Sequence, residues 1–181
     1  MHFRVEHLTP DLAWKRRDEI AAVYGAAFDV EQIVAESFRD VSLQNVLDYP
    51  GATVIAAIAR DRILGFLYGY TYVPGHWWPI HVGPRLEAEG HGALLENTFE
   101  LLELAVLPDA QGKGIGTALL RQLFATMPHD HVLLNTNARE DNRAVDLYRR
   151  LGFRVLISDF QYMKHGDENL IMAWSRDSAS H

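Results

Sequence analysis

The chain has 181 residues, of which 48% are hydrophobic and 23% are charged, and it contains no cysteine. This composition is typical of one globular domain, and it excludes disulfides, thiolate metal sites and cysteine nucleophiles. The formal net charge of -7 argues against a nucleic-acid-binding protein, because such proteins carry a basic patch or stripe. No apolar run approaches the ~20 residues that cross a bilayer, and the first residues lack the features of a signal peptide. We therefore expect one domain over residues 1–175, a polar tail at 176–181, a cytoplasmic location, and neither membrane nor nucleic-acid partners.

The first third of the chain predicts a strand, two helices and a β-hairpin. Thr9, Pro10 and Asp11 supply capping and helix-start residues, and the apolar residues that follow recur near the 3.6-residue period. The expected ranges are a strand at 3–8, helices at 12–28 and 31–47, and strands at 53–59 and 63–73 joined by a turn at Asp61 and Arg62.

The segment from Pro74 to Gly92 contains three prolines and four glycines and shows little periodicity. These features predict a long loop, and loops of this length inside a compact domain are often functional. Trp77 and Trp78 could form an aromatic wall for an apolar or cationic ligand. They could equally be a packing anchor or a contact in a homodimer.

The second half of the chain alternates strands with helices, so the predicted class is mixed α/β, without internal repeats. The expected strands are 98–106, 131–135, 153–158 and 170–174, and the expected helices are 114–127 and 142–151.

A glycine-rich turn that contains Gly112, Gly114 and Gly116 connects the strand at 98–106 to the next helix. Helix N-termini expose unpaired N–H groups and the positive end of the helix dipole, so this turn is a candidate phosphate site. A tight connection without a ligand is the alternative. Two common nucleotide motifs fail here: Gly114 follows Lys113 where a P-loop needs Ser or Thr, and Thr117 stands where a dinucleotide fingerprint needs its last glycine.

The turn, read as Gln111-Gly-Lys-Gly-Ile-Gly116, resembles the Gln/Arg-x-x-Gly-x-Gly/Ala signature of the GNAT superfamily of acetyl-CoA-dependent acetyltransferases. A second family block follows at Asn142-Arg-Ala-Val-Asp-Leu-Tyr148, then Gly152-Phe153, with its Ala two rather than three positions after Asn142. The resemblance covers roughly the whole chain. It implies a mixed, mostly antiparallel twisted sheet of about six to seven strands, flanked by about four helices, with splayed fourth and fifth strands.

The resemblance also implies acetyl-CoA as cosubstrate, with no metal. Backbone groups of Leu104 and Val106 would bind the acetyl carbonyl and the pantetheine arm, and Asn142 would bind the pantetheine or diphosphate region or would only cap its helix. The residues that would hold the pyrophosphate are Gln111, Gly112, Lys113, Gly114, Gly116 and Thr117.

By the same resemblance, Tyr148 is the general acid that protonates the departing thiolate, although its helical spacing also fits a core aromatic residue. Some members of the family carry a base glutamate four residues before the acetyl-binding position, and that residue is Glu100 in this sequence. Strand alternation places Glu100 and Glu103 on opposite faces. Glu103, a loop histidine (His76 or His81) and a water relay stay open as alternatives, as does the reading of both glutamates as exposed charges.

The predicted function is therefore acetyl transfer from acetyl-CoA to a primary amine, by direct attack in a ternary complex. A catalytically silent acyl-CoA-binding sensor is the alternative of another class. His129-Asp130-His131 is too short for a metal site and is interpreted as surface.

Overall fold

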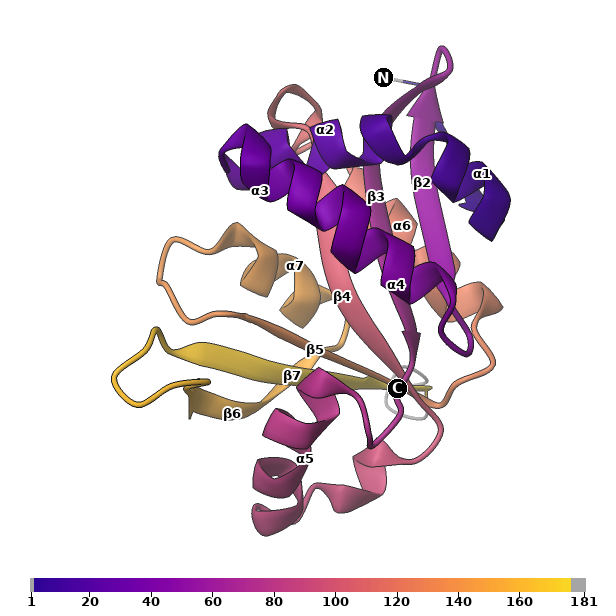
Figure 1. The fold of residues 1–181 in the computed structure, drawn as a ribbon. Coiled ribbons are helices and arrows are strands. Elements are labelled where there is room, and N and C mark those ends of the chain that lie inside the picture. Colours follow the sequence, from indigo (N-terminus) through magenta and orange to yellow (C-terminus); the bar gives the residue numbers. More distant parts are fainter. Residues whose placement is uncertain (1, 177–181) are drawn as a thin grey trace. The chain divides into compact units, whose positions relative to one another are not determined.

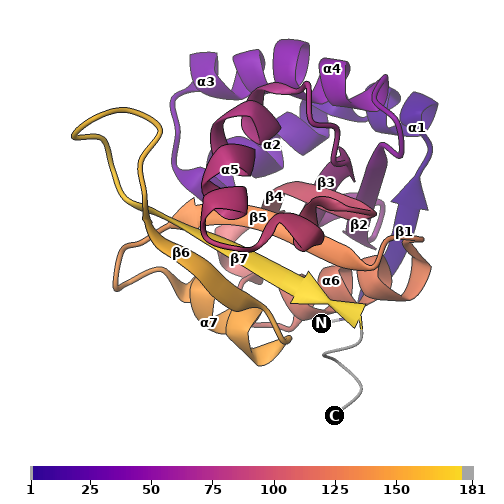
Figure 2. The same cartoon turned by 90° about the horizontal axis from the view of Figure 1, so that it is seen from below.

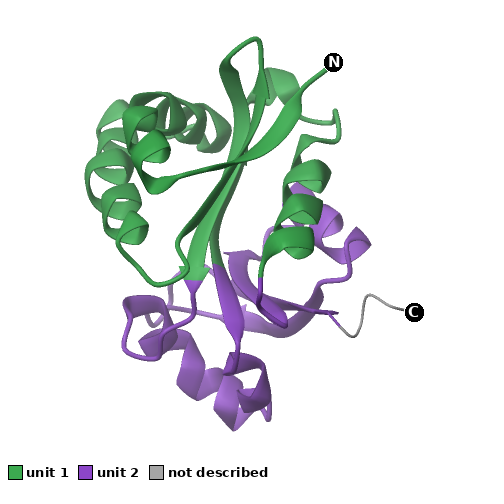
Figure 3. Ribbon diagram, turned by 90° about the vertical axis from the view of Figure 1, so that its right-hand side faces the viewer, with its two compact units in different colours: residues 1–70, 101–127 green, residues 71–100, 128–181 purple. Residues whose placement is uncertain are grey.

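The computed structural model describes residues 2–176, so the predicted tail from residue 177 onward lies outside the described residues. Two compact units make up the chain (Figure 3): unit 1 comprises the residues up to Tyr70 and Leu101–Met127, and unit 2 comprises Thr71–Glu100 and the residues from Pro128. The prediction of one domain over 1–175 stays a prediction. No helix among the described residues is long and apolar enough to cross a membrane.

Within residues 2–176, seven strands are hydrogen-bonded in the order β1-β2-β3-β4-β5-β7-β6. β4 (Thr98–Val106) runs parallel to β5 (His131–Asn137), with Thr98–Glu100 paired to His131–Leu133, and the sheet is otherwise mostly antiparallel. The predicted mixed α/β class with a mostly antiparallel sheet is confirmed. The splay between β4 and β5 stays a prediction.

Unit 1 places its N-terminal helices on one face of its strands and α6 on the other (Figures 1 and 3). β2 pairs with both β1 and β3, and α6 packs against β1 and β2. Besides β4, its elements are β1 (Arg4–Leu8), α1 (Pro10–Lys15), α2 (Arg17–Phe28), α3 (Gln32–Ser37), the π-helix η1 (Phe38–Leu43), α4 (Gln44–Leu47), β2 (Thr53–Ala59), β3 (Arg62–Thr71, whose last residue belongs to unit 2), η3 (Pro108–Ala110) and α6 (Ile115–Thr126).

The first predicted helix, 12–28, is two helices. Thr9 caps α1 as its sequence position predicts, with its hydroxyl accepting from the Leu12 N–H at 3.2 Å. Arg16 leaves helical geometry between α1 and α2, and its guanidinium donates to the Asp61 carbonyl at 2.6 Å. This contact with the hairpin accompanies the break, and no local sequence pattern reveals it.

The predicted hairpin is confirmed, but its turn lies one residue earlier than expected. Arg60 and Asp61 both have positive φ angles, 49° and 60°. Two consecutive left-handed residues are typical of a type I′ turn, whose twist matches that of the flanking strands.

Gly65 in β3 is required by space rather than by backbone conformation. A Cβ atom there would lie 2.8 Å from the backbone carbonyl oxygen of Ala105. We expect Gly65→Ala to lower the free energy of unfolding by about 1–3 kcal/mol, because β3 and β4 would have to separate. Urea denaturation measures this. Gly75→Ala is the matched control, because a Cβ at Gly75 meets nothing within 4 Å and its stability should stay near wild type.

Unit 2 places α5 and α7 on opposite faces of the strands β5, β7 and β6 (Figures 1 and 2). Besides β5, its elements are α5 (Trp77–Ala88), η2 (Gly92–Leu95), α7 (Arg143–Arg150), β6 (Arg154–Phe160) and β7 (Asn169–Ser175). The predicted strands and helices after residue 98 are all confirmed, with ends that shift by one or two residues.

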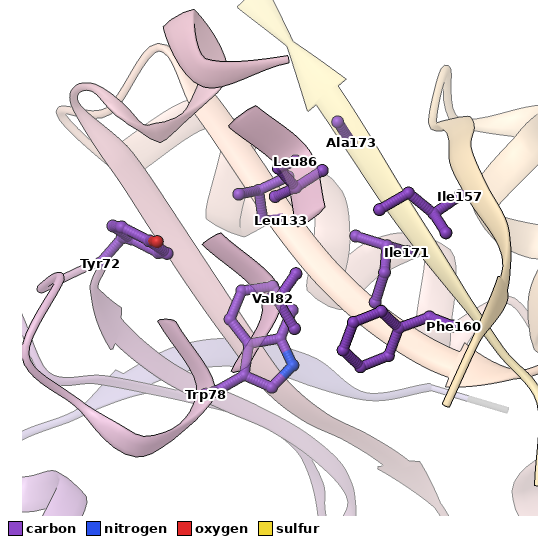
Figure 4. Close-up of a cluster of buried hydrophobic side chains, with 9 residues drawn as sticks. All are labelled: Tyr72, Trp78, Val82, Leu86, Leu133, Ile157, Phe160, Ile171 and Ala173. Carbon is purple, nitrogen blue, oxygen red and sulfur yellow. The ribbon is translucent and has the colours of Figure 1, made fainter. Parts of the chain in front are cut away.

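The prediction of a loop from Pro74 to Gly92 is wrong, because residues 77–88 form α5. Pro79 lies in the first turn, where the missing N–H costs no helical hydrogen bond, and Pro84 is tolerated inside the helix. The stabilising force is burial at every fourth position, from Trp78 through Val82 to Leu86 (Figure 4). They pack in one cluster with residues of the strands: Leu133, Ile157, Phe160, Ile171 and Ala173.

Candidate active site

The glycine-rich turn lies in unit 1, between η3 and α6. Gly112 and Gly114 have φ angles of 72° and 82°, and a Cβ on either would meet nothing within 4 Å. Backbone conformation rather than crowding therefore explains both glycines. The side-chain amide of Gln111 donates to the Val106 carbonyl at 3.1 Å and ties the turn to the end of β4.

The first turn of α6 presents backbone N–H groups without a side-chain cap. Gly114 occupies the N-cap position, and residues 111–114 are exposed. The Lys113 ammonium donates to the Asp109 carbonyl at 2.5 Å, so its charge stays beside the turn. Exposed N–H donors at a helix N-terminus, with a cation nearby, can bind a phosphate group.

The two glutamates of β4 have different environments. Glu103, in unit 1, is half-buried, and burial raises the pKa of its carboxyl to about 7. Its charge in turn contributes, after burial, to a raised pKa of Tyr24 in α2. A carboxylate with a pKa near the working pH can act as a general base.

Glu100, in unit 2, is only 1% exposed, so it is not an ordinary exposed charge. The pKa values of Tyr72 and Tyr162 are raised to about 12. Burial is the main cause in both, and the charge of Glu100 adds to it. Glu100 therefore lies in electrostatic range of two phenols, with Tyr162 also accepting a hydrogen bond from the Trp78 indole at 2.8 Å.

Asn142, in unit 2, caps α7. Its side-chain oxygen accepts from the Ala144 N–H at 3.1 Å, and its amide donates to Thr136 Oγ1 and the Asn137 carbonyl at 2.8 and 2.9 Å. These bonds confirm the capping interpretation, and the predicted contact with the cofactor stays a prediction.

Tyr148, also in unit 2, is 7% exposed and lies in α7 with its ring 5.3 Å from that of Phe153. The Phe153 N–H donates to the Tyr148 carbonyl at 3.0 Å, and Gly152 adopts a φ of 94° as the chain leaves the helix. Tyr148, Gly152 and Phe153 of the second sequence block thus lie together at the C-terminal end of α7. The core interpretation of Tyr148 is consistent with this packing, and its catalytic role stays a prediction.

The remaining candidates lie in structured parts of unit 2. His76 is the N-cap residue of α5, and His81, within α5, bonds through Nδ1 to the Trp77 carbonyl at 2.6 Å. Trp78 is buried and anchors α5, whereas Trp77 is 64% exposed and stacks on Tyr162.

The interpretation of His129-Asp130-His131 as surface is wrong for His129. That residue is 5% exposed, its Nε2 bonds to Thr71 Oγ1 at 2.9 Å, and burial lowers its pKa. Over residues 2–176, no group of three His, Asp or Glu side chains is placed to hold a metal ion.

The family model of the GNAT acetyltransferase domain matches residues 50–155, a range that contains β4, the glycine-rich turn, α6 and α7. The chain belongs to the GNAT acetyltransferase family.

Relatives in this family match this chain over only part of their own length. This GNAT chain is 43% identical over 114 residues to the GCN5-like protein acetyltransferase Rv2170 of Mycobacterium tuberculosis. The matched region covers 59% of this chain and 55% of that protein. It is 35% identical to the mycothiol acetyltransferase of an Arthrobacter species, over 62% of the chain and 30% of that protein. The matches thus span between about a third and about half of these relatives.

Solved structures agree with the GNAT fold. The PaiA N-acetyltransferase of Thermoplasma acidophilum, solved in complex with coenzyme A, has a TM-score of 0.63 and 16% identity, covering 97% of this chain and 99% of that one.

Sequence reasoning missed a group of stacked aromatic residues in unit 1, one of which, Tyr24, has a pKa that burial and then the charge of Glu103 raise. The Tyr24 ring stacks on that of Phe38 with 4.1 Å between centroids and an interplanar angle of 2°. Aromatic residues at 24, 28 and 38 were visible in the sequence, but no motif joins them to β4.

Proposed function

We propose that this GNAT domain transfers the acetyl group of acetyl-CoA to a primary amine, by direct attack in a ternary complex. The observation that carries the proposal is the exposed turn at Gly112–Gly114, which opens α6 with N–H donors that no side chain caps. These donors suit the pyrophosphate of CoA, and the family membership supplies the rest of the chemistry.

Acetyl-CoA recognition is assigned to backbone groups and few side chains. The N–H groups from Gln111 to Thr117 bind the pyrophosphate, Leu104 and Val106 bind the acetyl carbonyl and the pantetheine arm, and Asn142 contributes from α7. An N–H directed at the thioester carbonyl stabilises the negative charge that develops on its oxygen during attack. The turn and Leu104 belong to unit 1, and Asn142 and Tyr148 belong to unit 2, so their action on one acetyl-CoA is part of the proposal.

Tyr148 is proposed as the general acid. The amine nitrogen forms a bond to the carbonyl carbon, the C–S bond breaks, and the phenol gives its proton to the departing sulfur. A phenol with a reference pKa of about 10 can protonate an alkylthiolate with a reference near 8.5, because the transfer needs little free energy.

A carboxylate of β4 is proposed as the base that takes the proton from the attacking ammonium. Glu100 occupies the position that the family motif predicts. Glu103 is the second candidate, and partial exposure together with a pKa of about 7 supports it. An alkylammonium has a reference pKa of about 10.4, so the base with the higher pKa is the better match.

Acceptor amines on proteins are included in the proposal. The relative with 43% identity is named a protein acetyltransferase, which supports a lysine side chain or another peptide amine as the acceptor. Small-molecule amines stay within the same reaction class.

Incubation of the protein with acetyl-CoA and a panel of amines tests this function. The panel contains lysine-bearing peptides, peptides with a free N-terminus, and small mono- and diamines, and the readouts are free thiol and product mass. We expect free CoA and a singly acetylated amine in equal amounts. Binding of acetyl-CoA without release of CoA across the panel would identify a sensor instead.

A further inference from the structure

The helix α5 has a second apolar face, opposite to the one that anchors it. Its buried face carries Trp78, Val82 and Leu86, which lie against strand residues of unit 2 (Figure 4). Its outer face consists of exposed residues at helical spacing: Trp77, Ile80, His81, Pro84, Glu87 and Ala88. Among them only Glu87 carries a formal charge. A helix that is apolar on opposite sides is typical of an element that is covered on both.

The Trp77 side chain is fixed in an exposed position. It is 64% exposed, and its ring stacks on that of Tyr162 with 5.3 Å between centroids and an interplanar angle of 25°. Tyr162 is itself fixed, because its hydroxyl accepts from the Trp78 indole at 2.8 Å and its ring packs edge-on against that of Phe160. A large aromatic side chain that is ordered before binding loses little conformational entropy when a partner covers it, and such side chains dominate the energetics of protein interfaces.

Two more exposed apolar side chains come from the same two segments. Ile80, on the outer face of α5, is 56% exposed, and Met163, next to Tyr162 in the connection between β6 and β7, is 75% exposed. Single exposed apolar residues need no explanation, whereas a group of them marks a contact with another protein or a membrane.

The charges at the two ends of the outer face have opposite signs. Lys164 follows Met163 and belongs to the end at Trp77, whereas Glu87 lies at the C-terminal end of α5. Neither forms an ion pair within residues 2–176. When two copies of a helix pack antiparallel about a two-fold axis, each end of one helix meets the opposite end of the other. Lys164 then faces Glu87 of the partner subunit, and the charges are complementary.

We propose that the outer face of α5 binds a second copy of this chain, in a two-fold symmetric contact with antiparallel α5 helices and with Trp77 and Ile80 at its centre. Dimers of this symmetry are the commonest homo-oligomers. The net charge of -7 opposes association of two copies through most of the surface, and the outer face is nearly free of charge. This inference does not depend on the proposed acetyl transfer.

A membrane surface is a poorer match for the outer face of α5. Helices that lie on membranes carry several Lys or Arg side chains beside their apolar residues. The helix α5 contains one such residue, Arg85, and its guanidinium is already paired with Glu89 and Asp159.

Sedimentation velocity of the 181-residue chain tests the proposal. We expect the wild-type protein to have twice the mass of one chain at about 100 μM, a concentration above the micromolar dissociation constants of weak specific interfaces. Ile80→Lys should weaken dimerisation at least about tenfold, because it replaces an apolar contact with a charge in each copy. Ile33→Lys is the matched control, because Ile33 is 66% exposed on α3 in unit 1 and its replacement should leave the dimer intact.

A charge exchange tests the antiparallel arrangement. Glu87→Lys and Lys164→Glu should each weaken the dimer about fivefold, since like charges then face each other across the contact. The double variant restores opposite charges and should dimerise like wild type. Damage to the fold of one chain would not be rescued in this way, and melting temperatures show that each variant is folded.

A wild-type monomer at about 100 μM, equal dimerisation of Ile80→Lys and Ile33→Lys, or a double variant as weak as the single ones would overturn the proposal. A wild-type monomer that cosediments with anionic phospholipid vesicles would also overturn it and would identify a membrane surface instead.

Discussion

Replacement of Tyr148 by phenylalanine is expected to lower kcat by about 10²–10⁴-fold, the usual contribution of a positioned general acid. The hydroxyl is the only group removed, and the ring that packs against Phe153 is kept. Without this proton, the thiolate of CoA must leave with its negative charge uncompensated. Steady-state acetyl transfer at saturating acetyl-CoA measures the effect.

Two controls separate catalysis from packing at Tyr148. Because the phenylalanine ring keeps the apolar contacts of a side chain that is 7% exposed, the melting temperature should change little. The rise in melting temperature produced by acetyl-CoA should also persist. A wild-type kcat in Tyr148→Phe would show that the proton comes from another group.

Glu103→Gln is expected to lower the acetyl-transfer rate and, at the same time, to make the protein more stable in alkaline solution. As a general base, the carboxylate contributes about 10²–10⁴-fold to the rate. The pH profile of kcat/KM should rise through an apparent pKa near 7, where Glu103 loses its proton, and the glutamine variant should lack that limb.

The sign of the stability effect follows from the raised pKa. Glu103 binds its proton more tightly in the folded than in the unfolded state, with a pKa of about 7 against the ordinary glutamate value of 4.5. Its contribution is therefore fully present below the unfolded pKa and is lost as pH rises toward 7, so wild type loses stability across this window. Glutamine never ionises, and the variant should exceed wild type at pH 8 by roughly 1–3 kcal/mol in urea denaturation.

Glu100→Gln completes the comparison, because Glu100 is the base that the family motif predicts. If Glu100 is the base, the rate should fall in Glu100→Gln and stay near wild type in Glu103→Gln. The stability gain of Glu103→Gln does not depend on which residue is the base. A difference in stability between Glu103→Gln and wild type that stays the same from pH 5 to pH 8 would contradict the buried environment of Glu103.

Local patterns predicted most of the fold, and the failures have tertiary causes. Thr9 and Asn142 cap their helices as their residue types predict, because a cap depends on a few neighbouring residues. The helix α5 was missed because its prolines read as breakers, and the burial of Trp78, Val82 and Leu86 on distant strands outweighs their effect. The break at Arg16 likewise coincides with a tertiary contact, the hydrogen bond from its guanidinium to the Asp61 carbonyl.

The candidate site also contains features that local sequence predicts and features that depend on tertiary contacts. Gly112 and Gly114 could be predicted, since a positive φ angle is a local demand that glycine meets. The environment of Glu103 could not, because its raised pKa depends on burial by residues far along the chain. Alternation along β4 separates Glu100 from Glu103 but says nothing of how each is solvated.

Thermal unfolding with and without acetyl-CoA tests the central claim, that the turn before α6 belongs to an acetyl-CoA site. Acetyl-CoA at about 100 times its dissociation constant should add about 2.7 kcal/mol, a rise of roughly 5–10 °C for a chain of this size. Gly114→Val, which places a β-branched residue at a φ of 82°, should melt lower and show a smaller rise. An unchanged melting temperature of the wild-type protein in millimolar acetyl-CoA would contradict the account.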